Sequence, residues 1–161
     1  MLEFKKASRE DIPKLAQLFF ESRLNLYYKR SIAVLKKDLE IGIERDQIIV
    51  CVNQNKECCG YIRYNLNSEF GGGFPYLNTL IVDEKKQACG IGKKLYRYME
   101  RDACEQRWHT KIFCNVVARN EMSQIFWKKL GYIPIGRVDN LFKKGIDEIL
   151  MVKEVEYDTT K

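Results

Sequence analysis

The stretch from Leu80 to Leu95 constrains the fold most, because it changes from one kind of structure to another within a few residues. Its sequence, LIVDEKKQACGIGKKL, begins with aliphatic residues that favour a strand and continues into apolar residues at helical spacing. A short basic segment and two glycines, Gly90 and Gly92, lie between them. The chain therefore predicts a strand that passes through a glycine loop directly into a helix.

The start of this expected helix lacks a capping residue. The first N–H groups of a helix have no partner within it, and Ser, Thr, Asp or Asn usually accepts from them. The segment QACGIG, residues 87–92, contains none of these four residue types. Glycines admit a ligand close to the backbone and the helix dipole favours negative charge, while four lysines add positive charge: Lys85, Lys86, Lys93 and Lys94. The pattern favours a bound pyrophosphate; the alternative is a glycine turn before a water-capped helix.

Two other phosphate loops do not fit this segment. A P-loop requires Ser or Thr after Gly-Lys, and here Lys94 follows Lys93. A Rossmann loop requires a third glycine or alanine, but this chain has Leu95 at that position. It also requires an acidic residue at the end of the next strand, but the segment CNVVARN after Phe113 contains none.

What Gln87, Gly90 and Gly92 resemble is the QxxGxG acetyl-CoA pyrophosphate loop of the GNAT family of N-acetyltransferases, placed directly after a strand that ends in LIV. A second segment, NEMSQIFWKKLGY from Asn120 to Tyr132, is similar to the C-terminal helix signature of that family. The resemblance implies an α+β fold of three α/β layers. Its centre would be a mostly antiparallel mixed sheet with splayed parallel strands, flanked by helices.

Hydrophobic periodicity supplies elements in the order that this fold needs. Strands are expected at residues 2–6, 76–82, 111–117, 132–138 and 146–155. Two more strands, which start at residues 47 and 58, are expected to pair as a hairpin. Helices are expected around the apolar stripes Ile12, Leu15, Ala16, Phe19 and Ile32, Leu35, Leu39, Ile43, and from Ile91. A last helix would start after its N-cap Asn120, turn Met122, Ile125, Phe126 and Leu130 inward, and end at Gly131.

The resemblance also implies how acetyl-CoA would bind, in the cleft between the splayed strands. The backbone of Leu80, Ile81 and Val82 would pair with the pantetheine arm. The pyrophosphate would be wrapped by Gln87, Ala88, Cys89, Gly90, Ile91, Gly92 and Lys93. On the other wall, the implied contacts are Asn115, Asn120, Ser123 and Trp127.

The implied chemistry is direct transfer, in which a neutral amine attacks the thioester carbonyl and a backbone N–H near Val82 stabilises the oxyanion. The family's common acid is a tyrosine on the C-terminal helix, and this chain has Trp127 there. Because Ser123 lies one turn earlier on the same helical face, it or a bound water could protonate the thiolate. Tyr132, just beyond the helix, is another candidate.

Many members of the family have a glutamate that acts as the base on the strand before the loop. When residues 80–82, LIV, are aligned with the end of that strand, Tyr76 takes the position of the glutamate. We expect a water relay ordered by Tyr76 to remove the proton of the acceptor ammonium. Asn78 and Glu69 are nearby alternatives.

Composition narrows the remaining choices. A chain of 161 residues, 45% hydrophobic and 31% charged, suits one globular domain, which we place at 1–156 before a short tail at 157–161. Without an apolar run near ~20 residues or an apolar core at its start, we expect no membrane partner and a cytoplasmic protein. The charge of +6 is spread along the chain, so nucleic acid is not the expected partner.

The six cysteines form no CxxC pair and only one histidine, His109, accompanies them. This pattern predicts reduced, mostly buried thiols and no metal site. We interpret His109 as a surface or strand-edge residue, and Cys89 as a small residue that fits its loop.

The sequence thus predicts an acetyl-CoA-dependent N-acetyltransferase that acts on a primary amine. The acceptor stays open, although LNLYYKR from Leu24 and SEFGGGF from Ser68 are expected to frame its site. A catalytically silent acyl-CoA-binding regulatory domain is the alternative, and a basic interaction domain without the cosubstrate is a third. The sequence leaves open whether the protein forms a homodimer.

Overall fold

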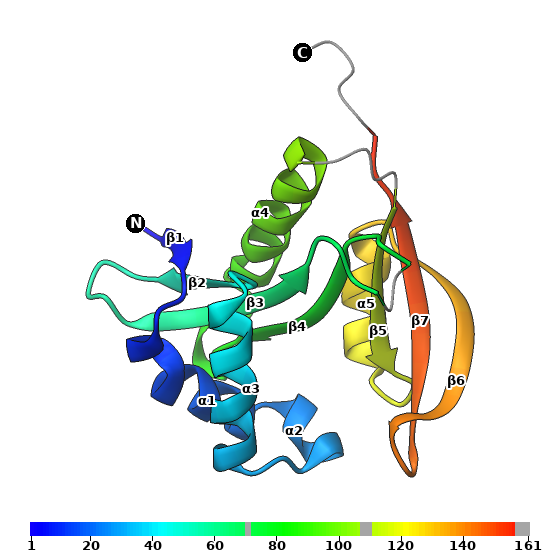
Figure 1. Cartoon of the computed structure of the whole chain (residues 1–161), viewed down its shortest axis with the longest axis horizontal. Coiled ribbons are helices and arrows are strands. Elements are labelled where there is room, and N and C mark those ends of the chain that lie inside the picture. The colour runs from blue at the N-terminus through cyan, green and yellow to red at the C-terminus, as the bar shows by residue number, and fades with distance from the viewer. Residues whose placement is uncertain (70–71, 107–110, 157–161) are drawn as a thin grey trace. The chain divides into compact units, whose positions relative to one another are not determined.

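The structure, a computed structural model, describes residues 1–69, 72–106 and 111–156 (Figure 1). The strands are β1 (Glu3–Lys6), β2 (Ile48–Val52), β3 (Cys58–Asn65), β4 (Tyr76–Val82), β5 (Lys111–Val117), β6 (Ile133–Lys143) and β7 (Ile146–Glu154). The α-helices are α1 (Ile12–Glu21), α2 (Arg23–Tyr28), α3 (Ile32–Glu44), α4 (Ile91–Gln106) and α5 (Glu121–Lys129), and two short 3-10 helices are η1 (Arg9–Asp11) and η2 (Glu84–Lys86). His109, Gly71 and the expected tail at 157–161 lie outside the described residues.

The seven strands form one sheet in the order β1-β2-β3-β4-β5-β7-β6. The pairs β1/β2, β2/β3, β5/β7 and β6/β7 are antiparallel. The pair β4/β5 is parallel and joins Tyr76 to Phe113 and Leu77 to Cys114. The expected α+β fold, with a mostly antiparallel mixed sheet, is therefore confirmed.

Contacts divide the chain into two compact units. The first contains Met1–Tyr64 and Thr79–Met99, and the second contains Asn65–Asn78 and Glu100–Lys161. Strand β4 belongs to both, because its first residues lie in the second unit and its last residues in the first.

The core of the first unit forms where α1 and α3 pack on β2 and β3. The four apolar residues predicted for α1, Ile12, Leu15, Ala16 and Phe19, are all buried there, as are Leu35 and Leu39 of α3. Before α1, the backbone N–H of Ser8 donates to the Asp11 carboxylate at 2.8 Å, which caps the short helix η1. This helical layer covers the face of the sheet opposite the first part of α4 (Figure 1).

The segment LNLYYKR contains a helix, α2, whose buried Asn25 accepts from the Arg30 N–H at 2.7 Å and so ties the helix to the chain that follows. One local prediction needs correction. The predicted inward stripe of α5 is wrong at Met122 and Ile125, which are 67% and 48% exposed, whereas Phe126 and Leu130 are half-buried. The buried residue of α5 is Trp127. The helix face that carries Trp127 therefore points to the interior, and the face that carries Met122 points outward.

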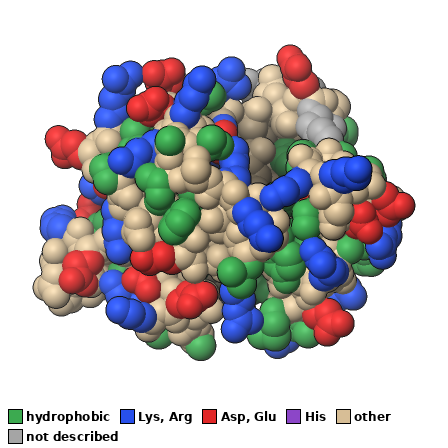
Figure 2. Space-filling model, turned by 90° about the horizontal axis from the view of Figure 1, so that it is seen from below, with side chains coloured by type: hydrophobic (Ala, Val, Ile, Leu, Met, Phe, Trp, Pro, Cys, Tyr) green, Lys and Arg blue, Asp and Glu red, His purple; other side chains and the backbone are tan. Residues whose placement is uncertain are grey.

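Surface charges of both signs alternate over the face shown in Figure 2, where Lys and Arg side chains lie among Asp and Glu. No helix within the described ranges is both long and apolar enough to cross a bilayer. Of the thiols, Cys51, Cys58, Cys59 and Cys114 are buried, so the expectation of mostly buried, unpaired cysteines is confirmed. Burial, helped by the neighbouring Cys59 and Cys58, raises the pKa of Cys51 to about 11.

Candidate active site

The glycine loop, residues 87–93, lies in the first unit between η2 and the start of α4. Ala88 and Gly90 adopt left-handed backbone angles, with φ of 65° and 74°. A Cβ atom placed at Gly90 would meet no atom of the described residues within 4 Å, so open space lies beside the turn in the described structure. The loop residues Gln87, Ala88, Cys89 and Lys93 are exposed, whereas Ile91 anchors α4 in the core.

The first turn of α4 leaves backbone donors available. The first helical hydrogen bond is donated by the Lys94 N–H to the Gly90 carbonyl, at 3.1 Å. Within the described residues, the N–H groups of Ile91, Gly92 and Lys93 donate to no acceptor of the protein. The first turn also contains no acidic side chain. The predicted uncapped helix start is present, and its donors and dipole suit an anion.

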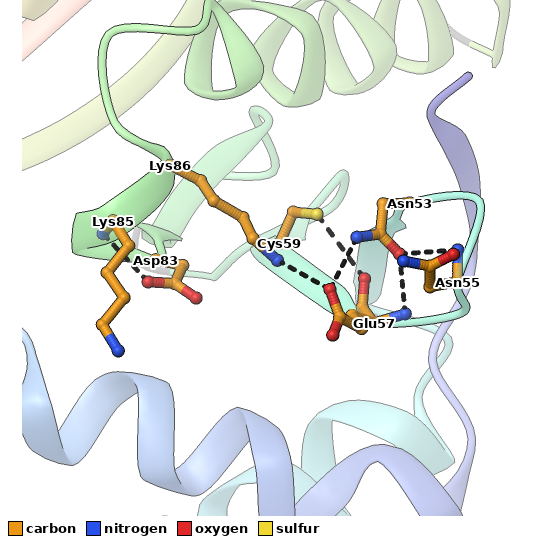
Figure 3. A network of polar contacts seen from close by, with 7 residues as sticks. All are labelled: Asn53, Asn55, Glu57, Cys59, Asp83, Lys85 and Lys86. Atoms are coloured by element: carbon orange, nitrogen blue, oxygen red, sulfur yellow. Dashed lines mark hydrogen bonds and ion pairs between the residues drawn. The ribbon is translucent and has the colours of Figure 1, made fainter.

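One of the four lysines predicted to serve this anion is already paired. A network joins η2 to the β2–β3 turn, in which Lys86 Nζ contacts Glu57 at 3.5 Å and Asn53 donates to the same carboxylate oxygen at 2.7 Å (Figure 3). Burial works to lower the pKa of Lys86, but Cys59 and Glu57 beside it raise that pKa. Across the described ranges, the ammonium groups of Lys85, Lys93 and Lys94 have no ion pair. Lys93 and Lys94, in the first turn of α4, can therefore serve an added anion. The Lys85 side chain points away from α4 (Figure 3) and lines a separate pocket with Glu10 and Lys14.

Strand β4 and η2 hold the loop in place. The Asp83 N–H donates to the Cys59 carbonyl at 2.9 Å, and the Asp83 carboxylate caps η2 through the Lys85 N–H at 3.0 Å. On the neighbouring strand, a Cβ at Gly60 would lie 2.6 Å from the Ile81 carbonyl oxygen, so only glycine permits this approach. Gln87 closes the turn by donating to the Val82 carbonyl at 3.3 Å. The predicted residues from Leu80 to Lys93 thus form one continuous local structure.

Helix α5 places the predicted residues of the second unit. The Asn120 side chain accepts from the Ser123 N–H at 3.1 Å, which confirms it as the N-cap. Trp127 packs edge-on against the Tyr132 ring at 5.4 Å, and both rings are buried. Ser123 is half-buried one turn before Trp127. Of the candidate acids, Ser123 is thus more accessible than Tyr132, which is 2% exposed.

Three side chains of the second unit form a buried polar chain across adjacent strands. The Tyr76 hydroxyl on β4 donates to Asn115 Oδ1 on β5. Asn115 Nδ2 then donates to Glu148 Oε2 on β7 at 2.8 Å. Tyr76 is 4% exposed, Glu148 is fully buried, and Asn115 is half-buried. We call Tyr76, Asn115 and Glu148 the buried polar chain.

Tyr76 stays protonated in this setting. Burial, the Cys114 thiol and the Glu148 carboxylate all raise the pKa of the Tyr76 hydroxyl well above its usual value. A neutral phenol cannot act as a base in its own right, but it can hold a water or an amine by hydrogen bonding. The arrangement suits the predicted ordering role of Tyr76 better than direct proton abstraction.

Glu148 is a residue that the sequence interpretation missed. It follows Ile146 and precedes Leu150 on one face of β7, so a carboxylate takes a position where the strand pattern is apolar. That polar interruption of an apolar face is a signal that could have found it. Its partner Asn115, by contrast, was already a predicted site residue.

Comparison with known proteins gives a consistent result. The model of the acetyltransferase (GNAT) family matches residues 12–132. A GNAT acetyltransferase from Bacillus cereus is 21% identical, with a TM-score of 0.74, over 97% of this chain and 99% of that one. A ribosomal-protein-alanine N-acetyltransferase from Brucella melitensis is 19% identical, with a TM-score of 0.75, over 95% and 99% of the two chains. An aminoglycoside 6′-N-acetyltransferase in complex with coenzyme A is 18% identical, with a TM-score of 0.75, over 94% and 96%.

Proposed function

The chain belongs to the GNAT acetyltransferase family, and we propose that it transfers the acetyl group of acetyl-CoA directly to a primary amine. The acceptor is a small molecule, a peptide or a protein. The proposed cosubstrate is acetyl-CoA, and a solved relative of the same fold carries coenzyme A.

The observation that carries this proposal is the open anion site at the start of α4. Three successive N–H groups lack an acceptor there among the described residues, and no atom of those residues lies within 4 Å of a Cβ placed at Gly90. Lys93 and Lys94 supply cationic groups without ion pairs in the described ranges. These features fit a diphosphate, whose oxygens accept several hydrogen bonds and whose charge the helix dipole favours.

The remaining cosubstrate contacts are proposed from the same residues that the sequence suggested. The backbone of Leu80, Ile81 and Val82 would pair with the pantetheine arm. The Asn120 oxygen is used as the helix cap, so we propose that only its Nδ2 is available to a ligand. We propose the half-buried Asn115 and Ser123 as further contacts, and Trp127 as a packing surface.

In the proposed reaction the amine nitrogen attacks the thioester carbon, so a C–N bond forms and the C–S bond breaks. A backbone N–H near Val82 would stabilise the negative oxygen. Tyr76 would order the water that accepts the ammonium proton, and Ser123 or a water would give a proton to the leaving thiolate. We assign Tyr132 to packing, because its ring is buried against Trp127.

Calorimetric titration of acetyl-CoA tests the binding step. Gly90→Trp places a large side chain in the open space, and we expect it to weaken binding about 100-fold or more, which is ~2.7 kcal/mol. Gly145→Trp is the matched control, because Gly145 has φ of 83° and the same open surroundings in another turn. Both variants carry the strain of a left-handed backbone, so a difference between them reports on the anion site.

Absence of acetyl-CoA binding by the wild-type protein would overturn the proposal. If acetyl-CoA binds, a library of primary amines with detection of released thiol tests the transfer itself. Binding without transfer to any amine would favour the catalytically silent acyl-CoA-binding regulatory domain. Loss of binding in Gly145→Trp as well as Gly90→Trp would contradict the location of the site.

A further inference from the structure

Glu148 is a fully buried carboxylate that accepts a hydrogen bond from Asn115, which in turn accepts from the Tyr76 hydroxyl. We propose that Glu148 is a positioning residue for acyl transfer, which fixes the Asn115 amide and, through it, the Tyr76 hydroxyl. This inference rests on the proposed function above.

A buried carboxylate carries a cost that the fold would otherwise avoid. Glutamate is almost never fully buried unless it is paired, because removing it from water is expensive. Ile146 and Leu150 lie on the same face of β7 as Glu148. If packing alone decided the residue at position 148, an aliphatic side chain would fit there. The hydrogen bond from Asn115 at 2.8 Å offsets part of this cost. A polar group kept at such a position points to a role beyond packing.

The carboxylate gives the chain of hydrogen bonds a direction. A carboxylate oxygen accepts, so the amide nitrogen of Asn115 must face Glu148. The amide oxygen of Asn115 then faces Tyr76, whose hydroxyl must donate to it. Without the carboxylate, the amide could turn over and the Tyr76 hydroxyl could exchange its donor and acceptor roles.

This direction matters for an amine acceptor. A hydroxyl whose proton is directed at Asn115 offers only its oxygen lone pairs to any further hydrogen bond. Such an oxygen suits an ammonium or amine N–H, or a water that receives the ammonium proton, because each of these is a donor. Glu148 would therefore make the Tyr76 oxygen a hydrogen-bond acceptor for the amine or the water, without itself touching the substrate.

The test compares Glu148→Gln, Tyr76→Phe and the double variant in thiol release from acetyl-CoA, with the amine that the screen above identifies. We expect Glu148→Gln to lower kcat about tenfold, since small losses of orientation have effects of this order or larger. The dissociation constant for acetyl-CoA should change less than kcat, because the glycine loop is untouched and only the proposed Asn115 contact is disturbed. In the Tyr76→Phe background, Glu148→Gln should add little, since its effect passes through Tyr76.

A merely structural role would give a different pattern. Unchanged kcat in Glu148→Gln, or effects of the two substitutions that multiply, would overturn the inference. Glu148→Asp keeps an accepting carboxylate and should recover part of the lost kcat. If Glu148→Gln does not fold, Asn115→Ala interrupts the same chain at a half-buried residue, and its effect on kcat should likewise vanish in the Tyr76→Phe background.

The failure of this inference is distinguishable from failure of the proposed function. A wild-type protein that neither binds acetyl-CoA nor releases thiol overturns both. A wild-type protein that does both, alongside an unaffected Glu148→Gln variant, overturns only the role of Glu148.

Discussion

The glycine loop and the buried polar chain are built on opposite principles. The loop is contiguous in sequence, exposed, and left with backbone donors that no described group accepts from. The buried polar chain joins residues on three strands that are 39 and 33 positions apart along the sequence. Its polar groups are bonded to one another and two of its three members are buried.

This difference indicates how each region should respond to substitution. Groups already bonded to each other in a low-dielectric interior stabilise the fold when complete and are costly when broken. Donors facing open space contribute little to folding and are available for a ligand. We therefore expect the buried polar chain to control stability and orientation, and the loop to control binding.

The largest expected effect is on stability, from Glu148→Ala. Removing the carboxylate leaves a cavity and an Asn115 amide without its acceptor, and we expect a loss of about 3 kcal/mol in the free energy of unfolding. Urea denaturation followed by circular dichroism measures it. Asp139→Ala removes an exposed carboxylate of β6 as the control and should leave stability unchanged. Equal losses in Glu148→Ala and Asp139→Ala would contradict the contrast drawn here.

The next effect should appear in binding alone. The double substitution Lys93→Ala and Lys94→Ala removes two cations beside the loop that form no ion pair with any described residue. We expect acetyl-CoA to bind about tenfold more weakly, ~1.4 kcal/mol. Calorimetry at low and high salt checks this, because screening should shrink the difference. The exposed pair Lys36 and Lys37 on α3, changed in the same way, is the control. A large fall in melting temperature without loss of affinity would assign the two loop lysines to folding instead.

The smallest effect concerns alkaline stability and the Tyr76 hydroxyl. Because the pKa of Tyr76 is raised in the folded state, the unfolded chain loses this proton first as the pH rises through about 10. The contribution of the hydroxyl is therefore complete below that pH and is lost above it. Tyr76→Phe should be less stable than wild type by about 1 kcal/mol at pH 8, and the gap should narrow toward pH 11. Urea midpoints of the wild type and of Tyr76→Phe across that pH range measure the difference in stability. A difference that does not change with pH would show that the pKa of Tyr76 is not raised in the folded protein.

Most elements of the fold could be predicted from the sequence because their signals are local. The strand Tyr76–Val82 and the strand Lys111–Val117 were predicted with the bounds that the structure has. Asn120 and Gly131 marked the ends of α5 through side-chain capping and a positive φ of 96°. The apolar stripe of α5 could not be read correctly, since helical spacing alone left Met122 and Trp127 as competing choices for the inward face.

The sequence by itself determined the glycine loop and the strand and helix around it. Its chemistry depends on residues that are neighbours in the chain: Gly90, which permits a left-handed angle, a missing cap, and adjacent lysines. Only the tertiary structure decided which lysine is already paired, because Glu57 reaches Lys86 from another turn. It also decided that Tyr76, Asn115 and Glu148 meet, since strand order and register bring distant residues into hydrogen-bond range. Backbone propensities act between neighbours in the chain, whereas a buried carboxylate acquires its partner only when the sheet has formed.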